Sequence, residues 1–474
     1  VVAIGYGVQR KSDLTGSVSS VNPDGLKSLP ATNVIAAMQG KVSGVEIVQN
    51  SGAPGASNSI RIRGMGTVND SDPLYVVDGI MMDNIDHIAV DDIASIEVLK
   101  DAASAAIYGS RAANGVVLLT TKSGEKSSKR LNISASIAGG FMKVANAPDI
   151  LSPADFARFS DYVHNANEYT AIAPDGSMVL TDAAQAEVAD GNDWWKQATR
   201  TGFNGKASVA LSGGDKNLNY YVSGNYLKSN GIVKQSGYER ISVNAKINSR
   251  LADCLKLGVQ AAYSRENRDE VSEGNRGVIK SAITYNPLMP VNDLDGGYTY
   301  LTPVENLRRL SYEKNIDKFT GQVKLDWNII KSLQFSTRAS YMMTRSDVDR
   351  MERNRASEEV IGTNSFVVRK NPIRTNTFGW DNILTWMPDF KNDHSLTVMV
   401  GQTMEISSGT GYGGYDDEFN SLGFAAFEQA TGSSSSGYTS LGLLSRVSYS
   451  FMNRYLLQVN FRADASSRFS KQNR

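Results

Sequence analysis

The side chains that most often carry catalysis or bind metals are sparse in this sequence. It contains one cysteine, Cys254, and three separated histidines, His87, His164 and His394. A lone cysteine can form neither an internal disulfide nor a thiolate cluster for zinc, and scattered histidines offer little to a metal centre. The motifs of phosphate loops, zincins and serine hydrolases are missing. We therefore expect no enzyme activity, no cofactor and no metal site, which leaves binding as the chemistry to explain.

Binding is indicated by aromatic side chains in stretches rich in glycine, serine and asparagine. Flat rings with polar edges can stack on sugars or hold peptides. The alternative for any single ring is packing within its own loop, or contact with the membrane interface or a partner protein. The candidates for ligand contact are Trp194, Trp195, Tyr298, Tyr300, Tyr412 and Tyr415.

The composition narrows the class of binding partner. The 49 basic residues equal the 49 acidic ones, so a polyanion such as nucleic acid has no overall attraction to the chain. No uncharged apolar run approaches the roughly 18 to 20 residues of a membrane-spanning helix. The strands of a membrane β-barrel need only about 9 to 11 residues of alternating polarity, so a barrel remains compatible with this composition.

Alternating segments fill the chain from about Lys129 onward, and eleven can be distinguished. In the fourth, residues 241–248, Ile241, Val243, Ala245 and Ile247 oppose Ser242, Asn244, Lys246 and Asn248. Each segment therefore predicts a strand with one apolar and one polar face. In a membrane barrel the apolar side, represented by Val243, Val323 and Val459, faces lipid, whereas in a soluble sandwich it is buried by a second layer.

The connections favour the barrel over the sandwich. Between the eleven segments they run about 63, 4, 12, 5, 53, 3, 31, 8, 34 and 3 residues, so long and short alternate throughout. Short turns such as 214–217 and 452–454 and long loops such as 407–440 would lie at opposite ends of the sheet. Outer-membrane barrels are built this way. Because single-chain bacterial barrels have an even number of strands, eleven indicates an incomplete barrel whose edges need partners.

The first 128 residues predict a separate, compact α+β unit. Asn33 can cap a short helix, Val34–Gln39, and a second helical stretch is expected at Ala102–Tyr108, ending at Gly109. Asp78-Gly79 is a strong hairpin-turn signal. Strands are expected at Val45–Val48, Ile60–Arg63, Leu74–Val77, Ile96–Leu99 and Gly115–Thr121.

Four ordered motifs in this unit resemble the plug domain of SusC-like TonB-dependent outer-membrane transporters. They are IRIRG at 60–64, PLYVVDG at 73–79, IEVLKDA at 96–102 and AIYGSRAANGV at 106–116. The opening VVAIGYG is similar to that family's TonB box, and RADASSRF at 462–469 is similar to a motif from the middle of its barrel.

The resemblance implies a mainly β fold: an α+β plug followed by about 11 strands of an expected 22-stranded antiparallel transmembrane barrel. Residues 1–20 would form the TonB-box region and the start of the plug, 21–128 the plug domain, and 129–474 the N-terminal half of the barrel with long extracellular loops. We expect a signal peptide and a further domain before Val1 and the second barrel half after Arg474.

The implied activity is active import of an oligosaccharide or peptide nutrient across the cell outer membrane, driven by TonB with ExbB-ExbD. A SusD-like surface lipoprotein and outer-membrane lipid would be the other partners. The alternatives are a surface adhesin or ligand-binding barrel that does not transport, and a soluble glycan-processing enzyme, for which no carboxylate pair stands in a recognisable context.

The resemblance also assigns roles to individual residues. An extended TonB box can leave the plug and add a strand to TonB. The charged plug residues are expected to pair internally or with the polar barrel wall and so to hold the closed state. The TonB-interaction candidates are Val1, Val2, Ala3, Ile4, Gly5 and Tyr6, and the plug-motif and gating candidates are Arg61, Arg63, Gly64, Asp78, Gly79, Glu97, Lys100, Tyr108, Gly109 and Arg111.

Overall fold

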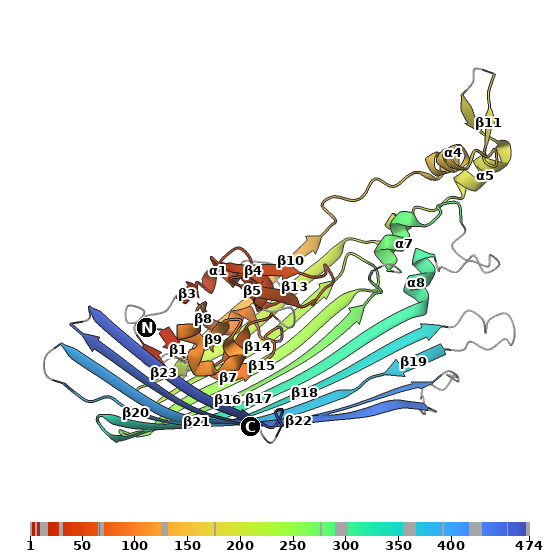
Figure 1. The fold of residues 1–474 in the computed structure, drawn as a ribbon. Helices are drawn as coiled ribbons and strands as arrows, with labels where there is room; N and C mark the ends of the chain where they lie inside the picture. The colour runs from red at the N-terminus through yellow and green to blue at the C-terminus, as the bar shows by residue number, and fades with distance from the viewer. Residues whose placement is uncertain are drawn as a thin grey trace.

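The protein consists of a small α+β unit lying against the concave side of one large antiparallel sheet (Figure 1). We call these parts the plug and the wall, and the side of the wall toward the plug its inner face. The computed structural model describes residues 2–4, 7–9, 18–27, 32–64, 66, 71–124, 131–174, 177–274, 277–289, 302–353, 366–390, 393–416, 429–452 and 454–470.

The plug is built on a five-stranded mixed sheet in the order β3-β8-β9-β6-β7. Strands β6 and β9 run parallel, and the other neighbours are antiparallel. A separate antiparallel pair is formed by β4 and β5. The bounds are β3 Val18–Val21, β4 Val45–Gln49, β5 Asn58–Ile62, β6 Leu74–Val77, β7 Ile80–Met82, β8 Ile93–Leu99 and β9 Val116–Thr121.

Local sequence signals in the plug are confirmed with small shifts of their ends. The Asn33 side chain accepts a hydrogen bond from Ala36 N at 2.8 Å and caps α2, Val34–Met38. The Asp78-Gly79 turn joins β6 to β7 with positive φ at both residues, as a two-residue hairpin requires. Arg63 is a correction: its φ of 58° ends the strand one residue earlier than expected.

Short helices complete the plug. The expected helical stretch at 102–108 is divided between an α-helical and a 3-10 turn, and it ends at Gly109. The bounds are α1 Asp24–Lys27, α3 Ala102–Ala105, η2 Val90–Asp92, η3 Ala106–Tyr108 and η4 Ser110–Ala112.

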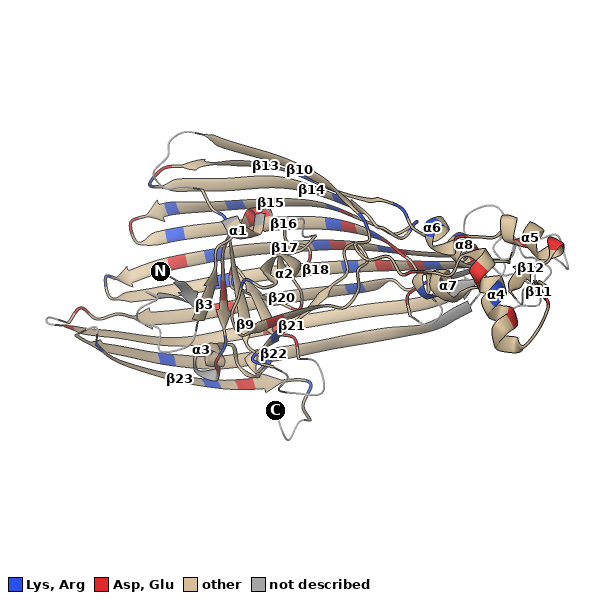
Figure 2. Ribbon diagram, turned by 90° about the horizontal axis from the view of Figure 1, so that it is seen from above, with Lys and Arg blue, Asp and Glu red and all other residues tan. Residues whose placement is uncertain are grey.

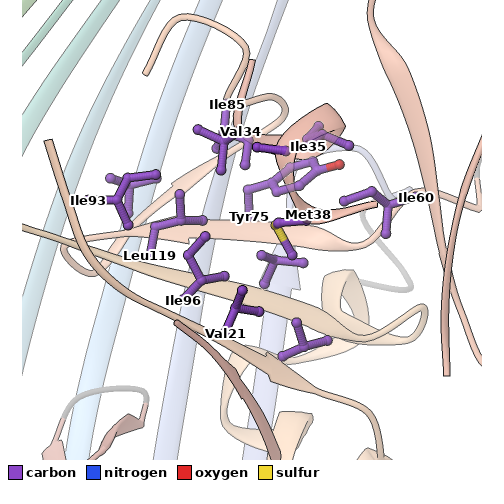
Figure 3. Packing of buried hydrophobic residues seen from close by; sticks show 14 of the residues in the cluster. Val21, Val34, Ile35, Met38, Ile60, Tyr75, Ile85, Ile93, Ile96 and Leu119 are labelled. Atoms are coloured by element: carbon purple, nitrogen blue, oxygen red, sulfur yellow. The ribbon is translucent and has the colours of Figure 1, made fainter. Parts of the chain in front are cut away.

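The plug has its own hydrophobic core (Figure 3). Helix α2 contributes Val34, Ile35 and Met38, which pack with Tyr75 of β6 and Leu119 of β9, all buried. Burying a large apolar side chain stabilises a fold by about 1.5–3 kcal/mol. The plug is therefore a packed unit that does not depend on the wall for its core.

The wall is a meander in which consecutive strands are neighbours and every pair is antiparallel. Its twelve strands occupy eleven positions, because β19 and β20 both lie between β18 and β21 and are separated at Pro372, which has no N–H for the ladder. The bounds are β10 Asn132–Met142, β13 Gly202–Gly214, β14 Leu218–Asn230, β15 Gly237–Ala252, β16 Leu255–Glu270, β17 Leu310–Ile330, β18 Leu333–Arg353, β19 Phe366–Lys370, β20 Ile373–Trp386, β21 His394–Asp416, β22 Gln429–Phe451 and β23 Tyr455–Ser466.

The two faces of the wall differ as the alternation predicted. The side chains of Val243, Val323 and Val459 are 46%, 49% and 55% exposed on the outer face. On β15, Ser242 and Asn244 point the other way and are buried. No second layer of protein covers these outer valines, so the sandwich alternative is wrong.

The connections sort by length onto the two ends of the wall (Figure 1). Residues 143–201 and 271–309 form long connections at one end, whereas 215–217 and 331–332 are short turns at the other. One expectation is corrected: the stretch 407–440 is not mainly loop, because β21 continues to Asp416 and β22 begins at Gln429. Their backbones pair from Ser407↔Tyr438 outward to Tyr415↔Gln429.

Helices gather at the long-connection end (Figure 2). Within the described residues, none is both long and apolar enough to cross a membrane. Helices α4 and α5 and the strand pair β11–β12 project away from the wall, whereas α6, α7 and α8 lie at its rim. The bounds are α4 Pro153–His164, β11 Thr170–Ile172, β12 Met178–Leu180, α5 Asp182–Ala189, α6 Trp194–Ala198, α7 Val278–Thr284 and α8 Pro303–Arg309.

Candidate functional site: the contact between plug and wall

The plug contacts the wall over two areas of different chemistry. We call the first the polar seat; its wall residues are Tyr221, Arg240, Lys246, Lys318 and Arg338, on β14 to β18. We call the second the apolar seat; its wall residues are Ile383, Met399 and Leu444, on β20 to β22.

The turn after β6 is the best-defined contact of the polar seat. Lys246 Nζ lies 2.9 Å from Asp78 Oδ1, and Thr121 donates to the same carboxylate through its backbone N–H. Burial alone would raise the pKa of the Asp78 carboxyl, but the charge of Lys246 and the hydrogen bonds from Thr121 outweigh it and hold that pKa below its usual value. Asp78 is therefore ionised when the plug is seated.

Gly79, the next residue, is required by the close approach of the wall. Its φ is +89°, and a Cβ built on it would lie 1.7 Å from Arg338 Nη1. The same nitrogen is 3.5 Å from the carbonyl oxygen of Asp78, while Asp381 accepts from Arg338 Nε at 3.0 Å and orients the guanidinium. The hairpin turn predicted from the sequence thus serves as a docking surface.

The loop after β7 makes the second set of polar contacts. Lys318 Nζ donates to Asn84 Oδ1 at 2.6 Å and lies 3.4 Å from His87 Nδ1, and Arg240 donates to the backbone carbonyl of Asp86. Burial lowers the pKa of His87 well below its usual value, and the charges of Lys318 and Arg240 lower it further. His87 is therefore neutral beside two wall cations.

The end of η2 makes the third polar contact. Tyr221 Oη and Asn225 Nδ2 each donate to the Asp92 carboxylate at 2.9 Å. Burial raises the pKa of Asp92, and these hydrogen bonds offset part of that rise. Asp92 also borders a cavity of about 50 Å³ between plug and wall, lined in part by Ser242, Asn244 and Gln260.

The cavity makes this seat suited to hydration. In the described part of the chain, Ser242 Oγ and the side-chain oxygens of Asn244 and Gln260 are buried without a hydrogen-bond partner in the protein. One water needs about 10–15 Å³ of such space and several polar partners, so the cavity has room for more than one.

The apolar seat is built differently. The wall residues Ile383, Met399 and Leu444 are 3%, 4% and 2% exposed and form one buried cluster with plug residues. The plug side of this cluster comprises Leu74, Val76, Leu99, Ala105, Ile107, Tyr108, Ala112, Val116 and Leu118.

Polar contacts surround the apolar seat. Arg462 Nη1 donates to the backbone carbonyl of Ile107 at 2.7 Å, and Asp464 accepts from Arg462 Nε at 2.8 Å. A Cβ added to Gly109, which has a φ of +75°, would lie 2.5 Å from Asp464 Oδ2. The RADASSRF segment and the AIYGSRAANGV segment, far apart in sequence, therefore meet here.

Arg111 is the charged plug residue that behaves as predicted. Its guanidinium bridges Glu405 on the wall, at 3.0 Å, and Asp83 of the plug, at 3.3 Å. Tyr438 also donates to the Glu405 carboxylate. The plug is thus tied to β21 and β22 by an ion pair at the edge of the apolar seat.

The other charged candidates do not reach the wall through contacts among the described residues. Lys100 donates to the carbonyl of Ser43 within the plug. Glu97 is buried in β8, where burial raises its pKa and Ser95 donates to it at 3.2 Å. Arg61 has a buried Nε with no described hydrogen-bond partner, and Arg63 and Gly64 are exposed. Their expected role in holding the plug against the wall is therefore limited to Arg111.

The TonB-box candidates are described in part. Val2, Ala3 and Ile4 form β1, Val2–Ile4, which is extended and paired antiparallel with β2, Gly7–Gln9. Val1, Gly5 and Tyr6 lie outside the described residues. In both ribbon views β1 lies toward the end of the wall opposite α7 and α8 (Figures 1 and 2).

The aromatic candidates for ligand contact are mostly corrected. Trp194 is 3% exposed, donates from Nε1 to the carbonyl of Asn286 at 3.0 Å and packs edge-on to Tyr285. Trp195 packs against the same small core. Tyr412 and Tyr415 lie on β21 and not in a loop, and Tyr412 is 51% exposed. Tyr298 and Tyr300 lie outside the described residues.

Sequence reasoning missed the wall cations as a group. Arg240 and Lys246 lie on the polar face of β15 in register with Ser242 and Asn244, so the signal was a basic residue repeated at even spacing on that face. The alternation identifies a polar face, but it cannot show that part of that face contacts protein and not only water.

An α+β plug resting on the polar inner face of a large antiparallel meander defines a plugged β-barrel receptor. Residues 10–116 match the family model described as TonB-dependent Receptor Plug Domain. The chain is 33% identical over 503 residues to TonB-dependent receptor P26 of Formosa agariphila and 30% identical over 526 residues to TonB-dependent receptor SusC of Bacteroides thetaiotaomicron. It belongs to the TonB-dependent receptors as a SusC-like member.

The extent of these matches is uneven. Both relatives align with 100% of this chain, which covers 49% of each, so the chain spans about half the length of the curated relatives it matches. Among solved structures, that of the RagAB peptide transporter superposes with a TM-score of 0.82 at 24% identity, over 97% of this chain and 56% of the other. That likeness shows the fold: a plug with part of a barrel. The relatives are receptors and transporters, and the chain is not an enzyme.

Proposed function

We propose that this protein acts in TonB-dependent import of an oligosaccharide or peptide nutrient across the cell outer membrane. The outer apolar face of the wall would contact lipid and the long connections would face the cell exterior. The names of two relatives support the cargo class: one is SusC, and the other is a peptide transporter.

The observation that carries the proposal is the way the plug is held. Wall cations donate to plug carbonyls at Asp78, Asp86 and Ile107. A single hydrogen bond contributes only about 0.5–1.5 kcal/mol net, or somewhat more with a charged partner, and water can replace it. A plug held by many such contacts stays closed at rest and can still be displaced by force, which an importer needs and an adhesin does not.

The force would enter through β1. Its extended backbone suits β-augmentation, in which the segment leaves β2 and pairs with a strand of TonB, and ExbB-ExbD would supply the energy. The position of β1 at the short-turn end of the wall supports this, because that end would face the periplasm. A SusD-like lipoprotein would cover the opposite end.

The test is site-specific crosslinking in energised cells. In a Cys254→Ser background, cysteines at Val2 and Ile4 should capture TonB during uptake, and a matched cysteine at Val459 on the outer face should not. Replacing Ile4 by Pro removes a backbone donor and should abolish TonB capture and uptake while leaving the amount of receptor in the membrane unchanged. Surface binding of cargo without TonB capture or uptake would instead support the adhesin alternative.

A further inference from the structure

A cavity of about 370 Å³ lies at the long-connection end of the wall, outside the contact between plug and wall. Its lining comes from three separate connections: the end of α6, the 231–236 turn between β14 and β15, and α8. Pockets of roughly 300–1,000 Å³ are the usual size for small ligands.

The rim of this cavity is basic. Arg200, Lys234 and Arg308 line it, and no acidic side chain does. The nearest printed carboxylate contact is Glu305, 3.4 Å from Arg308. Three positive side chains thus face one carboxylate that stands outside the lining, which leaves an excess of positive charge around the opening.

The floor of the cavity is apolar and rigid. Val304 and Leu307 of α8 line it, and Leu307 belongs to a buried cluster with Trp194, Val278 and Ala282. This cluster ties α6, α7 and α8 together beneath the cavity. It also explains why Trp194, predicted to contact ligand, is buried: the residue supports the site and does not line it.

The cations are held in place by the backbone around them. Arg200 donates from Nε to the carbonyl of Gly231 and from Nη2 to that of Ser236, both at 3.0 Å, while its Nη1 has no partner among the described residues. Lys234 N donates to the carbonyl of Ala198 at 2.9 Å, which fixes the turn against α6. Charged side chains that are fixed before binding lose less entropy when a ligand arrives.

The same turn contacts the plug. A Cβ placed on Gly231 would lie 3.0 Å from Pro54 Cγ, and one placed on the neighbouring plug residue Gly55 would lie 2.3 Å from the Tyr238 ring. A ligand that moved the 231–236 turn would therefore press directly on the plug loop at 51–57.

We propose that Arg200, Lys234 and Arg308 form a subsite for an anionic group, a carboxylate or sulfate, carried by the imported molecule. The apolar floor would take the ring face of a sugar or an aliphatic side chain next to that group. This inference rests on the proposed import function for calling the ligand cargo, although binding itself requires neither TonB nor energy. It narrows the cargo to acidic oligosaccharides or acidic peptides.

The test is equilibrium binding to the whole receptor purified in detergent from native outer membranes. The probes are trigalacturonate against a neutral galactose trisaccharide, and tri-aspartate against tri-asparagine amide. We expect one acidic probe to bind at least tenfold more tightly than its neutral counterpart, and more weakly as salt is raised. The arm that responds, sugar or peptide, identifies the source of the anion.

Variants locate the site. Lys234→Gln should weaken the acidic probe about tenfold, since one charge-assisted contact is lost, and Lys234→Gln with Arg308→Gln should remove the preference for acidic over neutral probes. Lys196→Gln, on the exposed part of α6 and outside the cavity lining, is the matched control and should leave affinity unchanged. Heat-modifiable gel mobility checks that each variant is folded.

Two outcomes would overturn the inference: acidic and neutral probes binding alike, or the double variant retaining the preference for acidic probes. Either would leave the import function intact if uptake still depends on TonB. Conversely, tight and site-dependent binding of an acidic probe without TonB-dependent uptake would keep the subsite and refute the import function.

Discussion

The two seats of the plug differ in what holds them. The polar seat uses charged side chains of the wall on plug carboxylates and carbonyls, around a cavity with room for water, whereas the apolar seat buries Ile383, Met399 and Leu444 against the plug. Water can replace the first kind of contact, but exposing the second costs about 25 cal/mol for each Å² of apolar surface. A pull on the plug should therefore open the polar seat first.

The largest expected effect comes from removing the buried cation of the polar seat. Lys246→Met leaves the Asp78 carboxylate buried and unpaired, which should weaken plug docking by about 3 kcal/mol. The measurement is urea-induced exposure of the plug to protease, with small-solute leak in liposomes as a second readout. Lys324→Met is the control, because Lys324 pairs with Asp326 on the wall at 2.9 Å and not with the plug.

A double variant tests the cause. Adding Asp78→Asn to Lys246→Met removes the stranded charge while keeping an acceptor for Thr121, so much of the loss should be recovered. If the double variant is as weak as Lys246→Met alone, the ion pair is not what holds this seat.

The apolar seat should respond nearly as strongly to a cavity. Leu444→Ala removes a side chain that is 2% exposed and should cost about 2–3 kcal/mol of docking free energy. Leu443→Ala, whose side chain is 55% exposed, is the matched control one residue away on the other face. Under a stepwise increase of urea, Leu444→Ala should lower the last step of plug release and Lys246→Met the first.

A smaller effect is expected from a methyl group at the hairpin turn. Gly79→Ala combines a φ of +89° with a Cβ 1.7 Å from Arg338 Nη1, and should cost about 2 kcal/mol. In an Arg338→Ala background the clash is gone, so the cost should fall to about 1 kcal/mol, which is the backbone strain alone. Equal costs in the two backgrounds would mean that Arg338 does not press on this turn.

The smallest effect is a dependence on pH at the polar seat. The pKa of His87 is lowered when the plug is seated, so the released plug binds more protons below about pH 6.5 and docking weakens as pH falls. We expect a loss of about 1 kcal/mol between pH 7 and pH 5. His87→Gln should flatten this profile; an unchanged profile would assign the titration to another group.

Much of the architecture could be predicted from the sequence because period and turn chemistry are local. The alternation at 241–248 identifies β15 and its two faces, and Asp78-Gly79 identifies the turn between β6 and β7. The loop at 407–440 was wrong because glycine and serine are typical of turns, while the ladder between β21 and β22 overrides that local preference.

The site was less predictable because it depends on contacts between distant residues. Arg462 and Ile107 are 355 positions apart, and no local pattern indicates that they meet. Trp194 shows the same limit from the other direction: an aromatic in a long connection suggests ligand contact, but Val278 and Leu307, from a different connection, bury it. Alternation reveals which face is polar and not what stands on it.

The hold of the wall on main-chain oxygens has a consequence for how such receptors diversify. The carbonyls of Asp78, Asp86 and Ile107 would accept from Arg338, Arg240 and Arg462 whatever side chains those plug positions carried, provided the backbone kept its course. A foreign plug with the same turns should dock in this wall. Domain exchange between family members would then be tolerated most readily where three arginines and two glycines, Gly79 and Gly109, are kept.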